Sequence, residues 1–249
     1  MSDPITSQRN PRIMYARGLA RASVRRAEGR TLVEGPHALE AASGAGAEIV
    51  EVFALEDDPI PEALGLGDVT VRVNRHVLEA VATTGTPRSP IAIVTMQAPS
   101  SLEGRDTLVL YEVGDPGNAG TLLRTASAFG MQVATTPNTV DMWSPKVLRS
   151  AAGTHWTTAI VPLREPIEEL RAAGLLLVAS VVAGGLGPDE AFDGGRPVAL
   201  LVGSEPHGLS ASVAEACDRA LTLGMSGDVE SLNVAIAGSI AIYELGQRR

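Results

Sequence analysis

Three short segments, far apart in this 249-residue chain, combine glycines with polar side chains at spacings typical of ligand-binding loops. They are Asp115-Pro-Gly-Asn118-Ala-Gly120-Thr-Leu-Leu-Arg124, Gly203-Ser-Glu205-Pro-His-Gly208-Leu209, and Met225-Ser-Gly followed by Ser231-Leu232-Asn233-Val234. Each comes after an apolar stretch that reads as a strand, ending at Val113, Val202 and Leu223. Because open parallel sheets bind ligands at the carboxyl ends of their strands, we expect the three segments to meet at one edge of a sheet.

The first segment contains more than a turn requires. Asp115 to Asn118 predicts a turn in which Asn118 caps a helix over residues 119–129. A cap does not account for Arg124. A glycine in a first helical turn costs about 1 kcal/mol relative to alanine, so Gly120 indicates a close neighbour at that backbone.

The second segment, on its own, is a weak signal. Gly203 and Gly208 frame a strand-to-helix turn, and the same pattern fits a plain two-glycine turn with an exposed acid, Glu205. As a cofactor loop, its glycines would let backbone amides approach the ligand closely. The loop has no lysine to neutralise a phosphate, which suits a cofactor without phosphate groups. The sequence lacks the glycine-lysine loop of nucleoside triphosphatases and the three-glycine fingerprint of dinucleotide enzymes, which argues against both classes. We expect His207 to be a solvent-facing loop residue without a role in the site.

The third segment opens the last expected helix of the chain. Ser231 is a suitable cap for a helix over Leu232 to Leu245. Asn233 then lies in the first turn of an otherwise apolar helix, where a buried amide must find a polar partner or lose its hydrogen bonds. We expect that partner to belong to a functional site.

In this order and spacing, the three segments resemble the signature motifs of the SpoU (TrmH-type) RNA ribose 2′-O-methyltransferases, a branch of the SPOUT superfamily. The resemblance implies an enzyme that moves a methyl group from S-adenosylmethionine to a ribose 2′-hydroxyl, with no metal. One departure is Gly224, where the family usually has proline. By resemblance, the cofactor is surrounded by Gly203, Leu223, Met225 and Leu232. The methyl-transfer site is formed by Asn118, Arg124, Glu205, Ser231 and Asn233.

Family members often use an arginine such as Arg124 as the base. A guanidinium stays charged at any physiological pH, so we expect Arg124 to hold a phosphate and stabilise the developing alkoxide instead.

Strands and helices alternate along the whole chain, which predicts an α/β protein. The polar stretch Gln97 to Asp106 reads as a linker. We therefore expect a small N-terminal α/β RNA-binding domain over residues 1–97 and a parallel-sheet SPOUT domain over residues 106–249. The resemblance further implies a deep trefoil knot in the second domain and a homodimer that completes the site across a two-fold axis.

Charge is distributed unevenly. The chain carries a net charge of −9, but residues 1–30 hold seven arginines and two acidic residues, a net +5 that leaves −14 for the remainder. RNA affinity depends on cations that displace phosphate counterions, so we interpret residues 1–30 as a basic arm that contacts RNA, with a solvated helix face as the alternative.

Composition argues against a membrane protein and against a disulfide or metal site. No apolar run reaches the roughly 18 residues of a membrane span, and the lone Cys217 fits a small buried apolar residue better than a disulfide or metal site. We expect a cytoplasmic enzyme acting on large-subunit ribosomal RNA. The alternatives are a tRNA methyltransferase, a non-catalytic RNA-binding relic of the same fold, and a small-molecule α/β enzyme.

Overall fold

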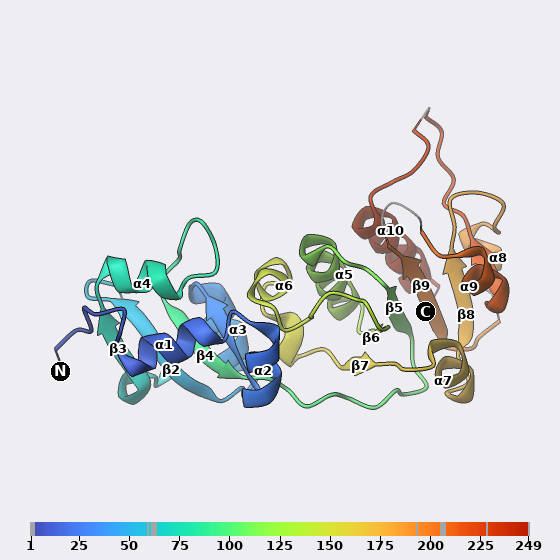
Figure 1. Cartoon of the computed structure of the whole chain (residues 1–249). Coiled ribbons are helices and arrows are strands. Elements are labelled where there is room, and N and C mark those ends of the chain that lie inside the picture. The colour runs from blue at the N-terminus through green and yellow to red at the C-terminus, as the bar shows by residue number, and fades with distance from the viewer. Residues whose placement is uncertain are drawn as a thin grey trace. The chain divides into compact units, whose positions relative to one another are not determined.

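The computed structural model describes residues 3–58, 60, 64–192, 194–204, 208–227 and 229–248. Its chain divides into two compact units, Met1–Ala98 with Asp141–Thr157, and Pro99–Val140 with Thr158–Arg249 (Figure 1). The first boundary between the units, between Ala98 and Pro99, falls inside the expected linker. Residues 141–157, which we expected to belong with the second domain, instead pack with the first unit. Whether residues 1–97 and 106–249 are separate folding domains remains a prediction.

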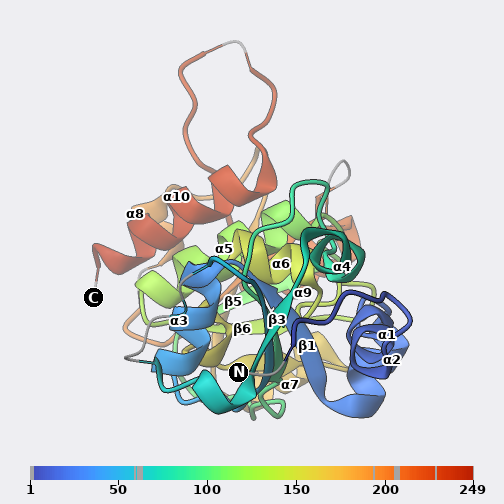
Figure 2. The ribbon, with the colours of Figure 1, turned by 90° about the vertical axis from the view of Figure 1, so that its left-hand side faces the viewer.

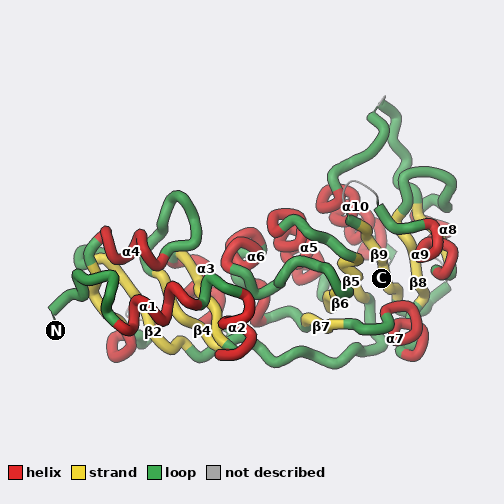
Figure 3. Tube along the Cα trace, in the orientation of Figure 1, coloured by secondary structure: helices red, strands yellow, loops and turns green. Residues whose placement is uncertain are grey.

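The first unit is built on a four-stranded sheet with the order β1-β4-β2-β3. Strand β4 runs antiparallel to β1 and β2, while β2 and β3 are parallel. The elements, shown by type in Figure 3, are α1 (Pro11–Gly18), α2 (Ala22–Glu28), β1 (Arg30–Glu34), α3 (Pro36–Gly44), β2 (Ile49–Leu55), η2 (Gly67–Val69), β3 (Thr70–Val73), α4 (Arg75–Val81), β4 (Ile91–Thr95), α6 (Pro145–Ser150) and η3 (Thr154–Trp156).

Both faces of this sheet are covered. Figure 2 shows α1, α2 and α4 on one side of the strands and α3 on the other. Alternate strand residues point to opposite faces, so Leu32 packs toward α1 and α4 while its neighbour Val33 packs toward α3. The core on the α3 face includes Leu148 and Trp156 from the segment 141–157. That segment therefore completes the unit's core although the chain reaches it only after the first strands of the other sheet.

The arginine-rich N-terminus is not an arm. Residues 11–28 form two helices, and Ile13, Ala16 and Leu19 are fully buried in the core of the first unit. Arg25 is buried as well, donating to Asp141 at 2.5 Å and to the carbonyl of Leu19 at 2.8 Å. The expectation of an arm was wrong because apolar residues at helical spacing lie between the arginines and carry this segment into the core, whereas its contact with RNA stays a prediction.

The second unit contains a parallel six-stranded sheet with the order β10-β8-β9-β5-β6-β7. This confirms the expected parallel α/β architecture. Its elements are β5 (Thr107–Tyr111), α5 (Pro116–Ala128), β6 (Gln132–Thr135), β7 (Ile160–Pro162), α7 (Pro166–Ala172), β8 (Leu176–Ser180), α8 (Pro188–Ala191), β9 (Val198–Gly203), α9 (Ala211–Ala216), β10 (Arg219–Leu221) and α10 (Val234–Gly246).

Strand β9 is buried along its entire length, as expected for a central parallel strand covered on both faces. On one face the sheet packs against α7 and α9. On the other, α5 and α10 lie side by side (Figure 1). They approach closely at Gly238, where an added Cβ would lie 2.5 Å from a methyl carbon of Leu122. Among the residues described, none of the helices combines the length and apolar character that crossing a bilayer requires.

Candidate active site

The first motif forms the start of α5. Asp115 is the N-cap, and its carboxylate accepts a hydrogen bond from the amide of Asn118 at 2.8 Å. Pro116 occupies the first helical position, where its missing N–H costs nothing. The expectation that Asn118 caps the helix was wrong, because Asp115 already satisfies the free amide there. The Asn118 side chain therefore remains available for another partner.

That partner comes from the third motif. Asn233 is the N-cap of α10, its Oδ1 accepting from the amides of Ala235 at 2.9 Å and Ile236 at 3.3 Å. Its Nδ2 donates to Oδ1 of Asn118 at 3.1 Å. The helix begins at Val234, so the expected Ser231 cap was also wrong. One amide side chain thus caps α10 and joins the first motif to the third across 115 positions of sequence.

The second motif is a tight loop at the end of β9. Ser204 and Gly208 form an isolated antiparallel bridge, with the Gly208 amide donating to the Ser204 carbonyl at 2.7 Å. Gly208 has a φ of 64°. A Cβ on Gly203 would overlap the backbone of Gly208 and Leu209. Glycine at position 203 is therefore required by the loop's own backbone, which is a stronger constraint than access for a ligand.

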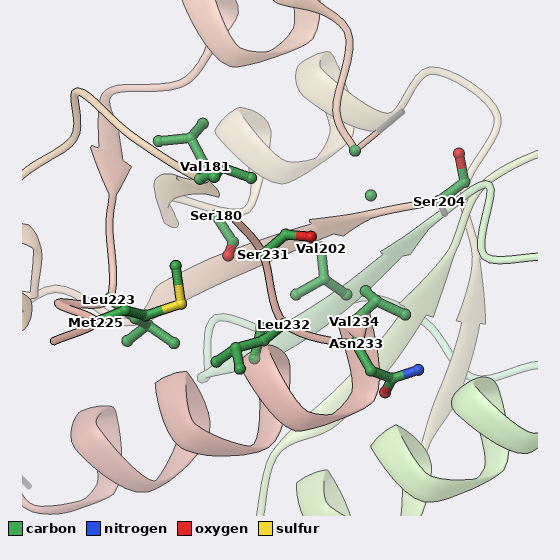
Figure 4. A pocket seen from close by; sticks show the side chains of 14 residues that line it. Ser180, Val181, Val202, Ser204, Leu223, Met225, Ser231, Leu232, Asn233 and Val234 are labelled. Atoms are coloured by element: carbon green, nitrogen blue, oxygen red, sulfur yellow. The ribbon is translucent and has the colours of Figure 1, made fainter. Parts of the chain in front are cut away.

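A cavity of about 380 Å³ lies where the second and third motifs meet. In Figure 4 the side chains of Leu223, Met225 and Leu232 lie toward one end of it, and those of Ser204 and Asn233 toward the other. The remaining lining residues are Ser180, Val181, Val182, Val202, Gly203, Gly208, Ser231, Val234 and Ala237. The volume falls within the roughly 300–1,000 Å³ typical of small-ligand sites.

The cavity is neutral and partly apolar. No lysine, arginine or acidic residue is among the described residues that line it. Val182 is 61% exposed, and Met225 and Leu232 are also exposed, although all three are apolar. The backbone groups of Leu223, Met225 and Leu232 form no backbone hydrogen bond with the described residues. Such a site can bind a ligand through main-chain polar groups and apolar contacts, without neutralising a phosphate.

The structure brings most of the expected site residues together. All four expected cofactor residues, Gly203, Leu223, Met225 and Leu232, line the cavity, as do Ser231 and Asn233. Asn118 reaches the site through its bond to Asn233. Arg124 does not line the cavity. It is exposed two turns along α5, without a hydrogen-bond or ion-pair partner among the described residues. Glu205 and His207 lie outside the described residues.

Sequence reasoning missed the wall of the cavity contributed by β8. Ser180 is the last residue of this strand, which pairs with β9, and Val181 and Val182 follow it. A signal existed, because the rule that places ligands at strand ends applies equally to this strand. It was overlooked because these residues carry no glycine pattern and no charge.

Cys217 belongs to the other face of the sheet, next to α9. It is half-buried, and its thiol lies 3.3 Å from the carbonyl of Val213. Burial raises the pKa of Cys217 to about 11, which keeps it as the unreactive thiol.

Comparison with protein families extends over most of the chain. Residues 106–243 match the SpoU rRNA Methylase family. Residues 10–92 match the MRM3-like substrate binding domain. The two matches leave residues 93–105 outside both, a stretch that contains the expected linker except for its last residue, Asp106.

Individual relatives are similar over nearly the full length or over about half of the chain. The chain is 31% identical to the 23S rRNA (guanosine(2553)-2′-O)-methyltransferase RlmP of Bacillus subtilis, over 97% of this chain and 98% of that one. It is 34% identical to the 23S rRNA (guanosine-2′-O-)-methyltransferase RlmB of Nitrosomonas europaea over 55% of this chain and 54% of that one. A crystal structure of an AdoMet-bound rRNA methyltransferase from Sinorhizobium meliloti superimposes with a TM-score of 0.86 at 27% identity, covering 99% of this chain and 98% of that one.

Proposed function

Because this chain belongs to the SpoU rRNA Methylase family and is an RNA 2′-O-methyltransferase, we propose that it methylates a ribose in large-subunit ribosomal RNA at the rim of the β9–α10 cavity. The observation that supports this placement most directly is the hydrogen bond between Asn233 and Asn118. It joins two motifs at the edge of the cavity and fixes two neutral amides next to a neutral pocket.

The cofactor is S-adenosylmethionine, and the cavity suits it. The molecule has adenosyl and methionine parts but no phosphate, which matches a pocket lined by backbone groups and apolar side chains. We assign its binding to Gly203, Leu223, Met225 and Leu232. When bound, it supplies an activated methyl group to the 2′-hydroxyl. The protein's part is to hold the ribose in line with that methyl and to manage the hydroxyl proton.

The amides set the geometry of the acceptor. Asn233 is held at one end by the α10 amides and at the other by Asn118, so its side chain has little freedom. We place Ser231, on the cavity wall, and Glu205 beside the same acceptor ribose. A group held in place by hydrogen bonds at both ends contributes orientation at little entropic cost during the reaction.

Arg124 acts on the RNA from outside the cavity. It is exposed and free of protein partners among the described residues, so it is available to a phosphate. A guanidinium remains charged at any physiological pH and cannot accept the 2′-hydroxyl proton. We assign it to the phosphate next to the acceptor ribose and to the negative charge that develops on the attacking oxygen.

We also propose that the enzyme is a homodimer whose second copy covers the outer face of α10. Ile236, Ile240 and Tyr243 recur at helical spacing and are exposed, Ile236 and Tyr243 to 51% each. Phe129, also exposed, packs edge-on against Tyr243 with ring centroids 6.3 Å apart. Contiguous exposed apolar residues of this kind mark association surfaces. From the family resemblance we also propose that the second unit contains a trefoil knot and that the enzyme is cytoplasmic.

The dimer is tested by sedimentation of the wild-type protein and of the Ile240→Asp variant. The carboxylate introduced on the apolar face of α10 should dissociate the dimer. Mixing Arg124→Ala chains with Asn233→Ala chains tests whether one site uses both protomers, since the heterodimer should regain activity only in that case. A monomeric wild-type protein would refute this part of the proposal.

The substrate is tested with RNA from a deletion strain. Purified enzyme and labelled S-adenosylmethionine should label large-subunit ribosomal RNA from that strain, and not the same RNA from the parent strain, where the position is already methylated. Label in tRNA alone would move the substrate to the alternative class. No label in any RNA would contradict the proposed function.

A further inference from the structure

A second hollow, of about 650 Å³, lies on the first unit. The described residues that line it are Thr6, Ser7, Gln8, Arg9, Met14, Arg17 and His76. They come from the N-terminal segment, from α1 and from α4, two helices that pack on the same face of the sheet (Figure 2). The hollow therefore joins residues that are nearly 70 positions apart in sequence.

The N-terminal segment forms a fixed wall of this hollow. Ile5 pairs with Val73 in a parallel bridge, and its amide donates to the Arg72 carbonyl at 2.8 Å. Gln8 then reaches α4, its Nε2 lying 2.9 Å from a ring nitrogen of His76 and 3.2 Å from the His76 carbonyl. These contacts hold the hollow open before any ligand arrives, which lowers the ordering cost of binding.

The seven arginines of this segment differ in their contacts, and Arg21 and Arg26 are exposed and do not line the hollow. Arg12 pairs with Glu51, Arg25 with Asp141, and Arg30 bonds to the hydroxyl of Tyr15 at 3.2 Å, so these three are committed to the protein. The side chains of Arg9 and Arg17 have no hydrogen-bond or ion-pair partner among the described residues, and both line the hollow. Two free guanidinium groups that converge on one concavity favour an anionic ligand, phosphate above all.

The hollow also offers surfaces that an inorganic anion would not use. Met14 is 59% exposed although it is apolar, and the His76 ring is exposed and oriented by Gln8. Apolar and aromatic surfaces beside free arginines are typical of sites where an unstacked RNA base is bound together with its phosphates. The hydroxyls of Thr6 and Ser7 supply further polar contacts at the rim.

We propose that this hollow binds one unstacked nucleotide of the substrate RNA, with its phosphates on Arg9 and Arg17 and its base against Met14 and His76. The inference rests on the proposed function, since it assumes an RNA substrate. It goes further by naming which part of that substrate is recognised: a single-stranded or flipped-out nucleotide away from the ribose that is methylated. Such a contact selects the RNA by structure and provides affinity that the acidic remainder of the chain lacks.

The test uses the full-length protein and a short single-stranded oligoribonucleotide of mixed sequence. The double variant Arg9→Gln/Arg17→Gln is compared with Arg21→Gln/Arg26→Gln, which removes the same charge from exposed arginines of the same segment that do not line the hollow. The first should weaken binding about tenfold or more and lower the salt dependence by about 1.4 logarithmic units per decade, at about 0.7 for each phosphate contact. The control should change affinity far less.

A neutral variant separates base contact from charge. Met14→Ala should weaken binding by about fivefold or more while leaving the salt slope unchanged, as expected when only an apolar contact with the base is lost. Equal losses in the two arginine variants, or no loss in Met14→Ala, would overturn the nucleotide site and leave only diffuse attraction. All variants should bind S-adenosylmethionine and unfold in urea like wild type, which confirms that both units are folded.

The failure of this inference can be told apart from the failure of the proposed function. If wild type methylates ribosomal RNA and the Arg9→Gln/Arg17→Gln variant does so with unchanged KM, only the nucleotide site is wrong. If wild type neither binds nor methylates RNA, both are wrong. The supporting result is a raised KM for RNA with kcat nearly unchanged, since the hollow contributes binding that is uniform through the reaction.

Discussion

The cavity beside α10 and the hollow beside α1 differ in the charge of the described residues that line them. The cavity beside α10 is lined by neutral and apolar groups, whereas the hollow beside α1 carries two free arginines. A cofactor without phosphate needs main-chain groups and apolar contacts, while a polyanionic substrate needs cations. The contrast supports the proposed separation of the two tasks, with methyl transfer at the cavity beside α10 and part of the RNA affinity at the hollow beside α1.

The largest expected effect concerns the packing that holds the first unit together. Trp156 is nearly buried in the core of the first unit, and its indole N–H donates to the Thr95 carbonyl at 3.1 Å. Trp156→Ala should destabilise the protein by about 3–5 kcal/mol in urea unfolding. Val229→Ala, at an exposed position of the second unit, is the matched control and should change little. An equally stable Trp156→Ala protein would show that residues 141–157 are dispensable for that unit.

Arg124 tests whether the neutral cavity needs a cation at its margin. Arg124→Ala should lower methyl-transfer turnover by about 10²-fold or more while S-adenosylmethionine affinity stays close to wild type. Arg124→Lys should recover little, because an ammonium cannot reproduce the planar fork of the guanidinium. Single-turnover rates near wild type in Arg124→Ala would remove this residue from the reaction.

Gly203 lies in a crowded part of the cavity wall, whereas Gly224 lies at an open position between two lining residues, Leu223 and Met225. Gly203→Ala places a methyl group inside the backbone of Gly208 and Leu209, so it should destabilise the loop by about 1–3 kcal/mol and weaken cofactor binding in calorimetry. Gly224→Ala meets no atom within 4 Å and should bind like wild type. Equal affinities in both variants would mean that the 203–208 loop plays no part in binding.

The smallest expected effect on stability comes from a substitution that separates the capping of α10 by Asn233 from its hydrogen bond to Asn118. Asn233→Asp keeps an oxygen to cap α10, so the free energy of unfolding should change by less than about 1 kcal/mol. The carboxylate cannot donate to Asn118, so turnover should fall clearly. Asn118→Ala should lower turnover in the same way, and the double variant should add little, as expected for two residues that act as one unit. Full activity in Asn233→Asp would assign the residue to capping alone.

The general position of the site could be predicted from the sequence, whereas its local details could not. Apolar strands followed by glycine-rich or amide-rich turns indicated one edge of a parallel sheet, and Gly203, Leu223, Met225 and Leu232 do line one cavity. The cap assignments failed because Asp115 and Asn118, like Ser231 and Asn233, are all good capping residues. Only the actual start of each helix decides between them. Pro116 at the first helical position was a usable signal for α5.

Long-range packing explains the other misses. Nothing in the pattern of residues 141–157 shows that Leu148 and Trp156 fill a core formed by strands some 50 to 120 positions earlier. In residues 1–30 the many arginines suggested an arm and drew attention away from the apolar residues between them. Those residues, Ile13, Ala16 and Leu19, are buried in the core. In both cases the sequence shows which residues are apolar, and only the three-dimensional structure shows what they pack against.

The most direct test of the proposed reaction is the chemical position of the transferred methyl group. RNA labelled by wild-type enzyme with methyl-labelled S-adenosylmethionine is hydrolysed in alkali, which cleaves next to free 2′-hydroxyls but not next to methylated ones. We predict that the label is recovered in alkali-resistant dinucleotides from one position of large-subunit ribosomal RNA, and that Asn233→Asp greatly reduces it. Label recovered on a base, in fully cleaved mononucleotides, would contradict ribose methylation at this site.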